Sequence, residues 1–347
     1  MAPPASAGGP VQGALRRLLE GLDLERAEAR DLLLAIMDGQ ATPAQIGAVL
    51  AALRMKGETV DEVVGGAEAM RARLTPVATR RRPVVDTCGT GGDGSGSFNI
   101  STAAALVVAA AGVCVAKHGN RAMSSACGSA DVLEALGVRI DLEPAAVARC
   151  LDEVGIGFMY APRFHQAMKH AAGPRRELGA RTIFNLLGPL ANPAAADRQL
   201  LGAFSAPAAS LLAHALARLG SERALVVHGD GGLDELALSG PSQVFEVRDG
   251  RVRAGEVTPE DAGLRRRPAR LAGGGAARNA ALMEAVLAGE PGDLLDAVLL
   301  NAGAGLLVAG AVESLAAGVE EARRLTVSGA ARARLGALRV FSQSVAE

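Results

Sequence analysis

The sequence predicts an α/β fold, in which a large domain with a mainly parallel central sheet flanked by helices follows a small all-helical domain. From Pro83 onward, short β-branched segments alternate with alanine-rich helical segments, which is typical of a parallel sheet covered on both faces. The preceding part of the chain has helical periodicity only. With 347 residues, of which 49% are hydrophobic, the chain is long enough for two domains.

Three regions are expected along the chain. Residues 1–13 are rich in alanine, glycine and proline and predict a flexible N-terminal tail. Residues 14–78 form the small helical domain, and residues 79–347 form the large α/β domain. The helical domain contains no cluster of catalytic side chains, so its expected role is architectural.

Capping signals mark the helices of the small domain. Thr42 followed by Pro43 is an N-cap with proline at the first helical position, and this helix should end at Gly57. Thr59 and Glu62 have the spacing of a capping box at the start of the next helix.

The large domain should contain five parallel strands and then a hairpin. The expected strands are Val84–Cys88, Val113–Ala116, Ile156–Tyr160, Arg198–Ala203 and Ala224–His228. Helices are expected between them, notably over Pro144–Val154 and Ala208–Leu219, and again over Ala276–Phe341 at the end of the chain. Asp249 and Gly250 form a strong hairpin signal between Gln243–Val247 and Arg251–Arg253.

Composition limits the classes of function and the location. The formal net charge of −1 argues against a nucleic-acid-binding surface. The apolar runs Ala103–Ala116 and Ala297–Val312 are too short to span a membrane, so no membrane partner is expected. The four cysteines lack metal-ligand spacing, and no signal peptide precedes the first domain, which favours reduced thiols in the cytoplasm.

A glycine-dense loop follows the first predicted strand. Its residues are Gly89, Thr90, Gly91, Gly92, Asp93 and Gly94. Ser101 is the expected N-cap of the helix that comes next. Backbone N–H groups of such a loop can approach an anion closely, which favours a phosphate cradle. The spacing fits neither common phosphate fingerprint, and a tight turn with packing glycines remains an alternative.

A second polar loop follows the second predicted strand. It contains Lys117, His118, Gly119, Asn120 and Arg121, and then Ser124, Ser125 and Ser129 around Gly128. Because the carboxyl ends of parallel strands meet at one edge of a sheet, both loops should lie where α/β folds bind ligands. Cations and hydroxyl groups beside a glycine loop suit a polyphosphate substrate.

Two adjacent carboxylates, Asp234 and Glu235, follow the fifth predicted strand. Oxygen ligands of this kind suit Mg²⁺, which keeps several of its own waters. By itself the pair is a weak signal, because Asp-Glu is also a common surface dipeptide.

The motifs GTGGD, FNIST, KHGNR and SADVLEALG closely resemble those of anthranilate phosphoribosyltransferase, and so does RTIFNLLGPLANP over residues 181–193. The resemblance covers about residues 14–341. It implies the fold of the nucleoside phosphorylase and phosphoribosyltransferase type. It also implies transfer of the phosphoribosyl group of PRPP to the amine of anthranilate, with release of pyrophosphate, in tryptophan biosynthesis. Expected further features are two Mg²⁺ ions per active site and a homodimer formed through the helical domain, which part of residues 170–195 should join.

The resemblance also assigns site residues. PRPP would contact the first loop and its neighbours: Gly89, Thr90, Gly91, Gly92, Asp93, Ser97, Asn99, Ser101, Thr102, Lys117 and Ser129. Anthranilate would contact Gly89, His118, Asn120, Pro162 and Arg175. Metal ligands would be Ser101, Asp234 and Glu235, and the catalytic set would be Arg175, Asp234 and Glu235. Arg175 suits the anthranilate carboxylate because a guanidinium binds carboxylate bidentately, and Arg176 is the less favoured alternative.

Departures from the family pattern are small: Gln166 replaces a usual proline, and Gly173 replaces a usual valine or proline. They affect the expected shape of the anthranilate pocket. No general base can be named, and pyrophosphate itself can accept the amine proton. Two other functions are alternatives, a pyrimidine-nucleoside phosphorylase and a non-catalytic nucleic-acid-binding relative. The complete loops and the carboxylate pair favour a pyrophosphate donor over the phosphorylase. A nucleic-acid-binding relative would be expected to carry a basic surface and to have lost the metal carboxylates, and this chain has neither feature.

Overall fold

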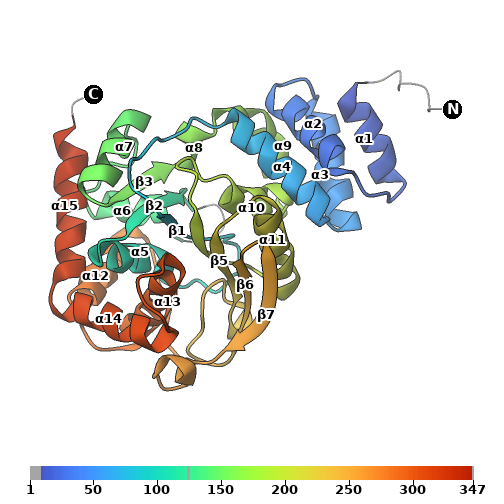
Figure 1. The fold of residues 1–347 in the computed structure, drawn as a ribbon. Coiled ribbons are helices and arrows are strands. Elements are labelled where there is room, and N and C mark those ends of the chain that lie inside the picture. Colours follow the sequence, from blue (N-terminus) through green and yellow to red (C-terminus); the bar gives the residue numbers. More distant parts are fainter. Residues whose placement is uncertain (1–8, 123–125, 346–347) are drawn as a thin grey trace. The chain divides into compact units, whose positions relative to one another are not determined.

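The computed structural model describes residues 9–122 and 126–345, and its chain divides into two compact units. The helical unit consists of Met1–Leu74 and His165–Ala191. The α/β unit consists of Thr75–Phe164 and Asn192–Glu347. The chain therefore leaves the α/β unit after its third strand, contributes a second segment to the helical unit, and then returns (Figure 1).

Six α-helices build the helical unit within the described residues. They are α1 (Pro10–Leu19), α2 (Arg26–Met37), α3 (Pro43–Lys56), α4 (Val60–Arg73), α9 (Lys169–Leu178) and α10 (Ile183–Leu187), with short 3₁₀ turns η1 (Gln166–Met168) and η2 (Gly188–Leu190). The expected caps are confirmed, because the side chains of Thr42 and Thr59 accept the N–H groups of Gln45 and Glu62. Helix α1 begins at Pro10, earlier than expected, since proline is pre-organised for the first helical position.

Glu62 is the polar centre of the helical unit. Its side chain is completely buried and accepts hydrogen bonds from the backbone N–H groups of Leu24 (2.9 Å) and Thr59 (2.8 Å). The Lys56 ammonium lies 3.0 Å from the same carboxylate and balances its charge. Glu62 of this capping box therefore also connects the segment before α2 to α3 and α4. The carboxylate needs these partners because burying an unpaired charge is costly.

A seven-stranded sheet forms the centre of the α/β unit, in the order β3-β2-β1-β4-β5-β6-β7. The strands are β1 (Val84–Gly89), β2 (Cys114–Gly119), β3 (Ile156–Tyr160), β4 (Arg198–Gly202), β5 (Arg223–His228), β6 (Ser242–Arg248) and β7 (Arg251–Val257). The first five are parallel, as predicted, and β6 and β7 form the predicted antiparallel hairpin at one edge.

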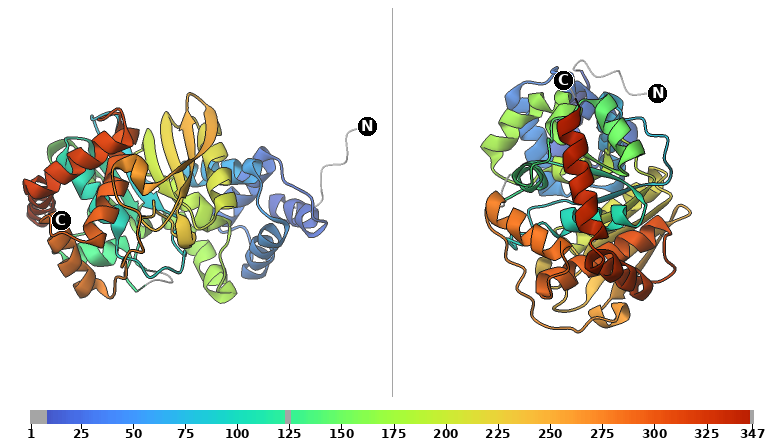
Figure 2. Two further views of the ribbon diagram at one scale, coloured as in Figure 1. Left: turned by 90° about the horizontal axis from the view of Figure 1, so that it is seen from below. Right: turned by 90° about the vertical axis from the view of Figure 1, so that its left-hand side faces the viewer.

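Helices cover both faces of this sheet. The helices are α5 (Ile100–Ala110), α6 (Ser129–Ala135), α7 (Pro144–Glu153), α8 (Ala161–Phe164), α11 (Ala206–Arg218), α12 (Ala276–Leu287), α13 (Asp293–Ala309), α14 (Leu315–Val327) and α15 (Ala330–Ser344), with 3₁₀ turns η3 (Asp230–Gly232) and η4 (Pro259–Ala262). Val115 of β2 belongs to the larger core, with α5 and α12–α15, whereas its neighbours Cys114 and Ala116 pack with α7 on the other face. Figure 2 shows α12–α15 gathered beside α5.

The strand order creates a switch point between β1 and β4. From β1 the chain proceeds to β2 and β3 on one side, and β4 and β5 then extend the sheet on the other side of β1. In open parallel sheets, ligands bind beyond the carboxyl ends of the strands at such a point. Among the described residues, no helix is both long enough and apolar enough to cross a bilayer.

Candidate active site

The carboxylate pair lies at this switch point, on the loop after β5. Gly229 donates its N–H to the Leu233 carbonyl at 2.8 Å, which turns the chain back towards the sheet. Asn301, fully buried in α13, accepts the N–H of Leu236 at 2.9 Å and donates to the Leu236 carbonyl at 3.1 Å. These bonds hold the main chain on both sides of Asp234 and Glu235.

Two glycines make room for Asp234 where β1 and β4 end. A Cβ atom on Gly202 would collide with the carbonyl oxygen of Asp234, and one on Gly89 would lie 2.7 Å from its Oδ2. Gly89 and Gly202 are direct partners in the β1–β4 ladder. The backbone therefore approaches the switch point more closely than any side chain would permit, which explains why glycine is needed at both strand ends.

Each carboxylate is bound by a backbone N–H of the predicted phosphate motif. Gly91 donates to Asp234 Oδ2 at 2.9 Å, and Ser101 donates to Glu235 Oε1 at 3.0 Å. The prediction that Ser101 is the N-cap of α5 is wrong, because α5 begins at Ile100 and Asn99 is its N-cap. Glu235 supplies the acceptor that a capping side chain would otherwise provide, and its negative charge suits a helix N-terminus.

Burial and neighbouring negative charges raise the pKa of both carboxyl groups. Burial, together with the nearby charge of Asp93, raises the pKa of Asp234 to about 7. Burial, together with the charge of Asp234, raises the pKa of Glu235 to about 8. Because both pKa values are higher in the folded protein than in an unfolded chain, this pair favours folding at low pH, and that stabilisation is lost as the pH rises through about 8.

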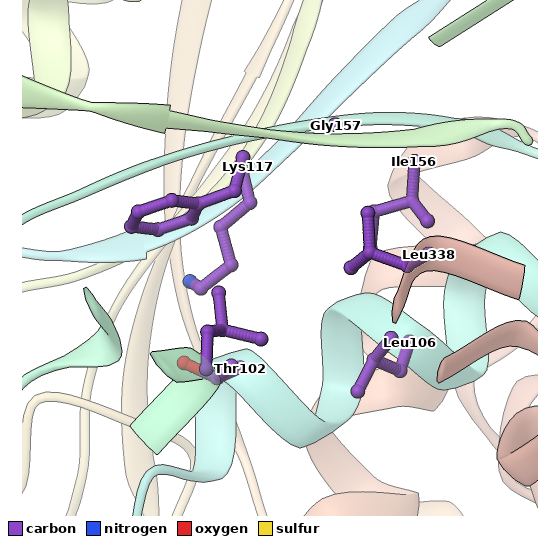
Figure 3. Close-up of a pocket in the computed structure, with 8 residues that line it drawn as sticks. Thr102, Leu106, Lys117, Ile156, Gly157 and Leu338 are labelled. Atoms are coloured by element: carbon purple, nitrogen blue, oxygen red, sulfur yellow. The ribbon is translucent and has the colours of Figure 1, made fainter. Parts of the chain in front are cut away.

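Lys117 is a buried counter-charge for Glu235. Its Nζ donates to the Thr87 carbonyl at 2.6 Å, and only 3% of the residue is exposed. Burial lowers the pKa of its ammonium, while the charges of Asp86 and Glu235 oppose this shift. Lys117 points towards Thr102 of α5 across a cavity of about 10 Å³ (Figure 3). The Thr102 hydroxyl has no hydrogen-bond partner among the described residues, and this space suits one water molecule.

The second predicted loop is built on buried side chains. Asp86 accepts the His118 N–H at 3.4 Å and the Asn192 side-chain amide at 2.8 Å, so β1, β2 and the segment after Ala191 are joined. Beyond β2, the Asn120 carbonyl accepts the Ser129 hydroxyl at 3.4 Å. Ser124 and Ser125 lie outside the described residues. Pro162 follows β3 in α8 and is exposed.

Arg175 and Arg176 belong to α9 of the helical unit, and the structure distinguishes them. The Arg175 guanidinium lies over the Phe184 ring, 5.2 Å from its centroid, and burial lowers its pKa. Arg176 is exposed. Within residues 9–122 and 126–345, no carboxylate pairs with Arg175. A guanidinium stacked on an aromatic ring retains its edge for a carboxylate, which favours Arg175 as an anion-binding group.

The carboxylate pair fits Mg²⁺ better than a metal that needs a closed protein cage. No group of three or more His, Cys, Asp or Glu side chains suited to a metal occurs in the described part of the chain. Mg²⁺ is commonly held by one or two carboxylates together with substrate phosphates and water. Asp234 and Glu235 supply such an oxygen set, and because burial makes their charged forms costly, a cation that neutralises them would be favoured there.

Sequence reasoning missed the residues that support this site, chiefly Asn301, Gly202 and Asp86. Asn301 had one available signal, since a lone asparagine within the apolar run Ala297–Val312 needs a buried partner. Gly202 had no local signal, because the group that requires it lies on another loop.

Comparison with known proteins first defines the class. The chain matches the model described as "Glycosyl transferase family, helical bundle domain" over residues 12–74. It matches "Glycosyl transferase family, a/b domain" over residues 81–332. These two domains agree with the helices and the sheet described above.

Individual relatives then indicate which enzyme of this glycosyl transferase family the chain resembles. Anthranilate phosphoribosyltransferase from Desulforudis audaxviator is 57% identical over 334 residues, covering 96% of each chain. The enzyme of that name from Anaeromyxobacter sp. (strain K) is 58% identical over 326 residues, covering 94% of this chain and 96% of the relative.

Solved structures similar to this chain are also anthranilate phosphoribosyltransferases. The crystal structure of anthranilate phosphoribosyltransferase from Thermus thermophilus has a TM-score of 0.90 and 48% identity, covering 95% of this chain and 99% of the other. The Saccharomyces cerevisiae enzyme in complex with PRPP and Mg also has a TM-score of 0.90, at 26% identity, covering 98% of this chain and 99% of the other. The chain belongs to the anthranilate phosphoribosyltransferase family.

Replacing Gly202 by alanine should displace Asp234. We expect Gly202→Ala to lower the free energy of unfolding by about 1–3 kcal/mol, as overpacking does, and to reduce Mg²⁺-dependent turnover strongly. The matched control is Gly255→Ala in β7, where a Cβ would meet no atom within 4 Å. Denaturant unfolding and initial rates would be measured for both. Equal behaviour of the two variants would contradict the close packing at the switch point.

Proposed function

We propose that the protein transfers the phosphoribosyl group of PRPP to the amine of anthranilate, producing N-(5-phosphoribosyl)anthranilate and pyrophosphate, in tryptophan biosynthesis. The observation that carries this proposal is the carboxylate pair at the switch point. Gly91 of the glycine loop donates its N–H to Asp234, and Ser101 of the FNIST motif donates its N–H to Glu235. Relatives more than 50% identical over nearly the whole chain have this activity in their names. Neither the phosphorylase nor the nucleic-acid-binding alternative gains support.

We assign the metal to Asp234, Glu235 and Ser101. The similar yeast enzyme has been solved with PRPP and Mg, which supports Mg²⁺ as the cofactor. Two ions per active site is our proposal, which rests on the resemblance of the site motifs to those of the family. Bound there, Mg²⁺ would neutralise the charge that develops on the departing pyrophosphate.

The PRPP site is proposed to surround the glycine loop. Gly89, Gly91 and Gly92 are exposed, so ligand can reach their backbone. The remaining proposed contacts come from residues around the loop and the two neighbouring strands: Thr90, Asp93, Ser97, Asn99, Ser101, Thr102, Lys117 and Ser129. Because Lys117 and Thr102 are buried, we expect both to act on PRPP indirectly, Lys117 by its charge and Thr102 by positioning.

Anthranilate is proposed to contact Gly89, His118, Asn120, Pro162 and Arg175. Arg175 would bind the carboxylate of the substrate, because its guanidinium is pre-oriented on Phe184. A structure of the yeast enzyme with 4-fluoroanthranilate supports an aromatic acid as the acceptor.

The chemistry requires positioning more than proton transfer by the protein. The ribosyl carbon acquires oxocarbenium character as the bond to pyrophosphate breaks. The aromatic amine is neutral near pH 7 and can attack once it is aligned with that carbon. We assign no general base, and the departing pyrophosphate can take the amine proton.

We further propose a homodimer formed through the helical unit, and a cytoplasmic location. Leu19, Leu22 and Met55 of this unit are 70%, 46% and 87% exposed, so large apolar side chains are available there for burial against a partner. All four cysteines are free thiols, as a reducing compartment requires.

The activity can be tested through anthranilate fluorescence. Purified protein with PRPP and Mg²⁺ should cause a decay of anthranilate emission, and omission of any component should prevent it. No decay with folded protein would refute the proposed function, and assays with phosphate and uridine or thymidine would follow.

The acceptor site can be tested at two adjacent arginines. Arg175→Ala should raise the KM for anthranilate at least about tenfold, because the substrate carboxylate loses a bidentate charged partner. The KM for PRPP should change little. Arg176→Ala is the matched control and should leave both constants close to those of the wild type. Equal effects of the two substitutions, or equal effects of Arg175→Ala on both substrates, would contradict the assignment.

The dimer can be tested by placing a charge on the exposed apolar side chain of Met55. Met55→Asp should shift the mass measured by light scattering from dimer towards monomer, because burying a carboxylate in an apolar interface is unfavourable. The control is Val340→Asp in α15, which is 70% exposed in the α/β unit and should leave the mass unchanged. A wild-type monomer, or a dimer that survives Met55→Asp, would count against this interface.

A further inference from the structure

A second segment of the chain crosses the end of the PRPP loop. Phe98 donates its N–H to the Leu271 carbonyl at 2.8 Å, and Gly273 donates to the Gly96 carbonyl at 3.0 Å. Between these bonds, Ser97 and Ala272 form an antiparallel bridge. The segment Leu271–Gly275, which precedes α12, therefore holds the loop immediately before it enters α5.

Asn279 in the first turns of α12 secures this crossing. The residue is 1% exposed. Its Oδ1 accepts the N–H of Gly274 at 2.8 Å, and its Nδ2 donates to Asn99 Oδ1 at 2.9 Å. A Cβ on Gly273 would lie 2.8 Å from the same Oδ1, so the segment packs directly against the amide.

Asn99 extends the connection to the second loop of the site. Its Nδ2 donates to the Cys127 carbonyl at 3.1 Å. The two side-chain amides thus form a chain from the segment before α12, through the N-cap of α5, to the loop that precedes α6. We call this connection the asparagine clasp, meaning the side chains of Asn99 and Asn279.

The loop between Gly89 and Asn99 needs such a support. Gly91, Gly92, Gly94 and Gly96 all have positive φ, so the free loop has many backbone conformations to lose. At its start, the loop is fixed by β1 and by the bond from Thr90 N–H to the Gly202 carbonyl at 2.9 Å. At its end, the crossing segment and the clasp provide the corresponding anchor.

We propose that Asn279 is a positioning residue for PRPP, which orders the glycine loop before the substrate binds by holding Asn99. This inference rests on the proposed function only for the identity of the ligand. The clasp uses the amide oxygen of Asn99 and one of its amide protons, which leaves the second amide proton for PRPP. A loop that is ordered beforehand loses less conformational entropy on binding, so the clasp contributes to PRPP affinity and not to the chemical step.

The test compares two variants of Asn279 with a control of equal burial. Asn279→Ala should raise the KM for PRPP about tenfold, because two neutral hydrogen bonds of the loop support are lost. It should leave kcat and the KM for anthranilate unchanged. Asn279→Asp keeps an acceptor for Gly274 but loses the donor to Asn99, and should be at least as impaired. The control is Ser342→Ala in α15, a fully buried hydroxyl that accepts the Arg139 N–H, and its kinetic constants should match the wild type.

Hydrogen exchange on the ligand-free protein tests the clasp independently of activity. Asn279→Ala should increase amide exchange in residues 93–99 and 271–275 while the sheet stays protected. Unchanged exchange there would overturn the proposal even if the enzyme is active, whereas an inactive wild type would refute only the proposed function.

Double substitution tests whether Asn99 and Asn279 act as one unit. If Asn99 acts through the clasp, Asn99→Ala with Asn279→Ala should raise the KM for PRPP no more than the larger single effect. Multiplied effects of the two substitutions, or a fall in kcat from Asn279→Ala alone, would overturn the proposal.

Discussion

Two adjacent carboxylates, Glu235 buried and Asp234 half-buried, are the constraint on which the α/β unit depends. Asp234 and Glu235 lie at the carboxyl ends of β1 and β4, and burial raises both pKa values because the charged carboxylates are costly there. Backbone N–H groups of Gly91 and Ser101 and the buried ammonium of Lys117 limit this cost. The arrangement is unfavourable for folding alone but suited to a divalent cation and a polyphosphate.

The path of the chain distributes the proposed roles between the two units. The groups assigned to PRPP and Mg²⁺ all belong to the α/β unit, whereas Arg175 belongs to the helical unit. This division arises because residues 165–191 leave the α/β unit between β3 and β4, the point at which the sheet order reverses. The same chain path thus creates the switch point and places Arg175, the arginine proposed to bind anthranilate, in the helical unit.

Features encoded by neighbouring residues can be predicted from the sequence. The five parallel strands, the hairpin at Asp249 and Gly250, and the caps at Thr42 and Thr59 depend on local patterns, and the structure has them. Ser101 resembles an N-cap in the local pattern, but the acceptor of its N–H, Glu235, lies 134 positions away. The roles of Asn279 and Gly202 are invisible for the same reason, since their partners lie on distant segments. The reaction and its substrates, which local patterns do not determine, are predicted from the resemblance of the motifs to those of a known family.

The most direct measurement of the central constraint is proton release when the metal binds. Mg²⁺ would be titrated calorimetrically into protein saturated with PRPP, in two buffers with different protonation enthalpies. Because deprotonated carboxylates bind the metal, the wild type should release protons at pH 7 but few at pH 9, above the pKa of about 8 for Glu235. The Asp234→Asn, Glu235→Gln double variant should lack this difference. Equal proton release by both proteins at pH 7 would contradict a metal site at this pair.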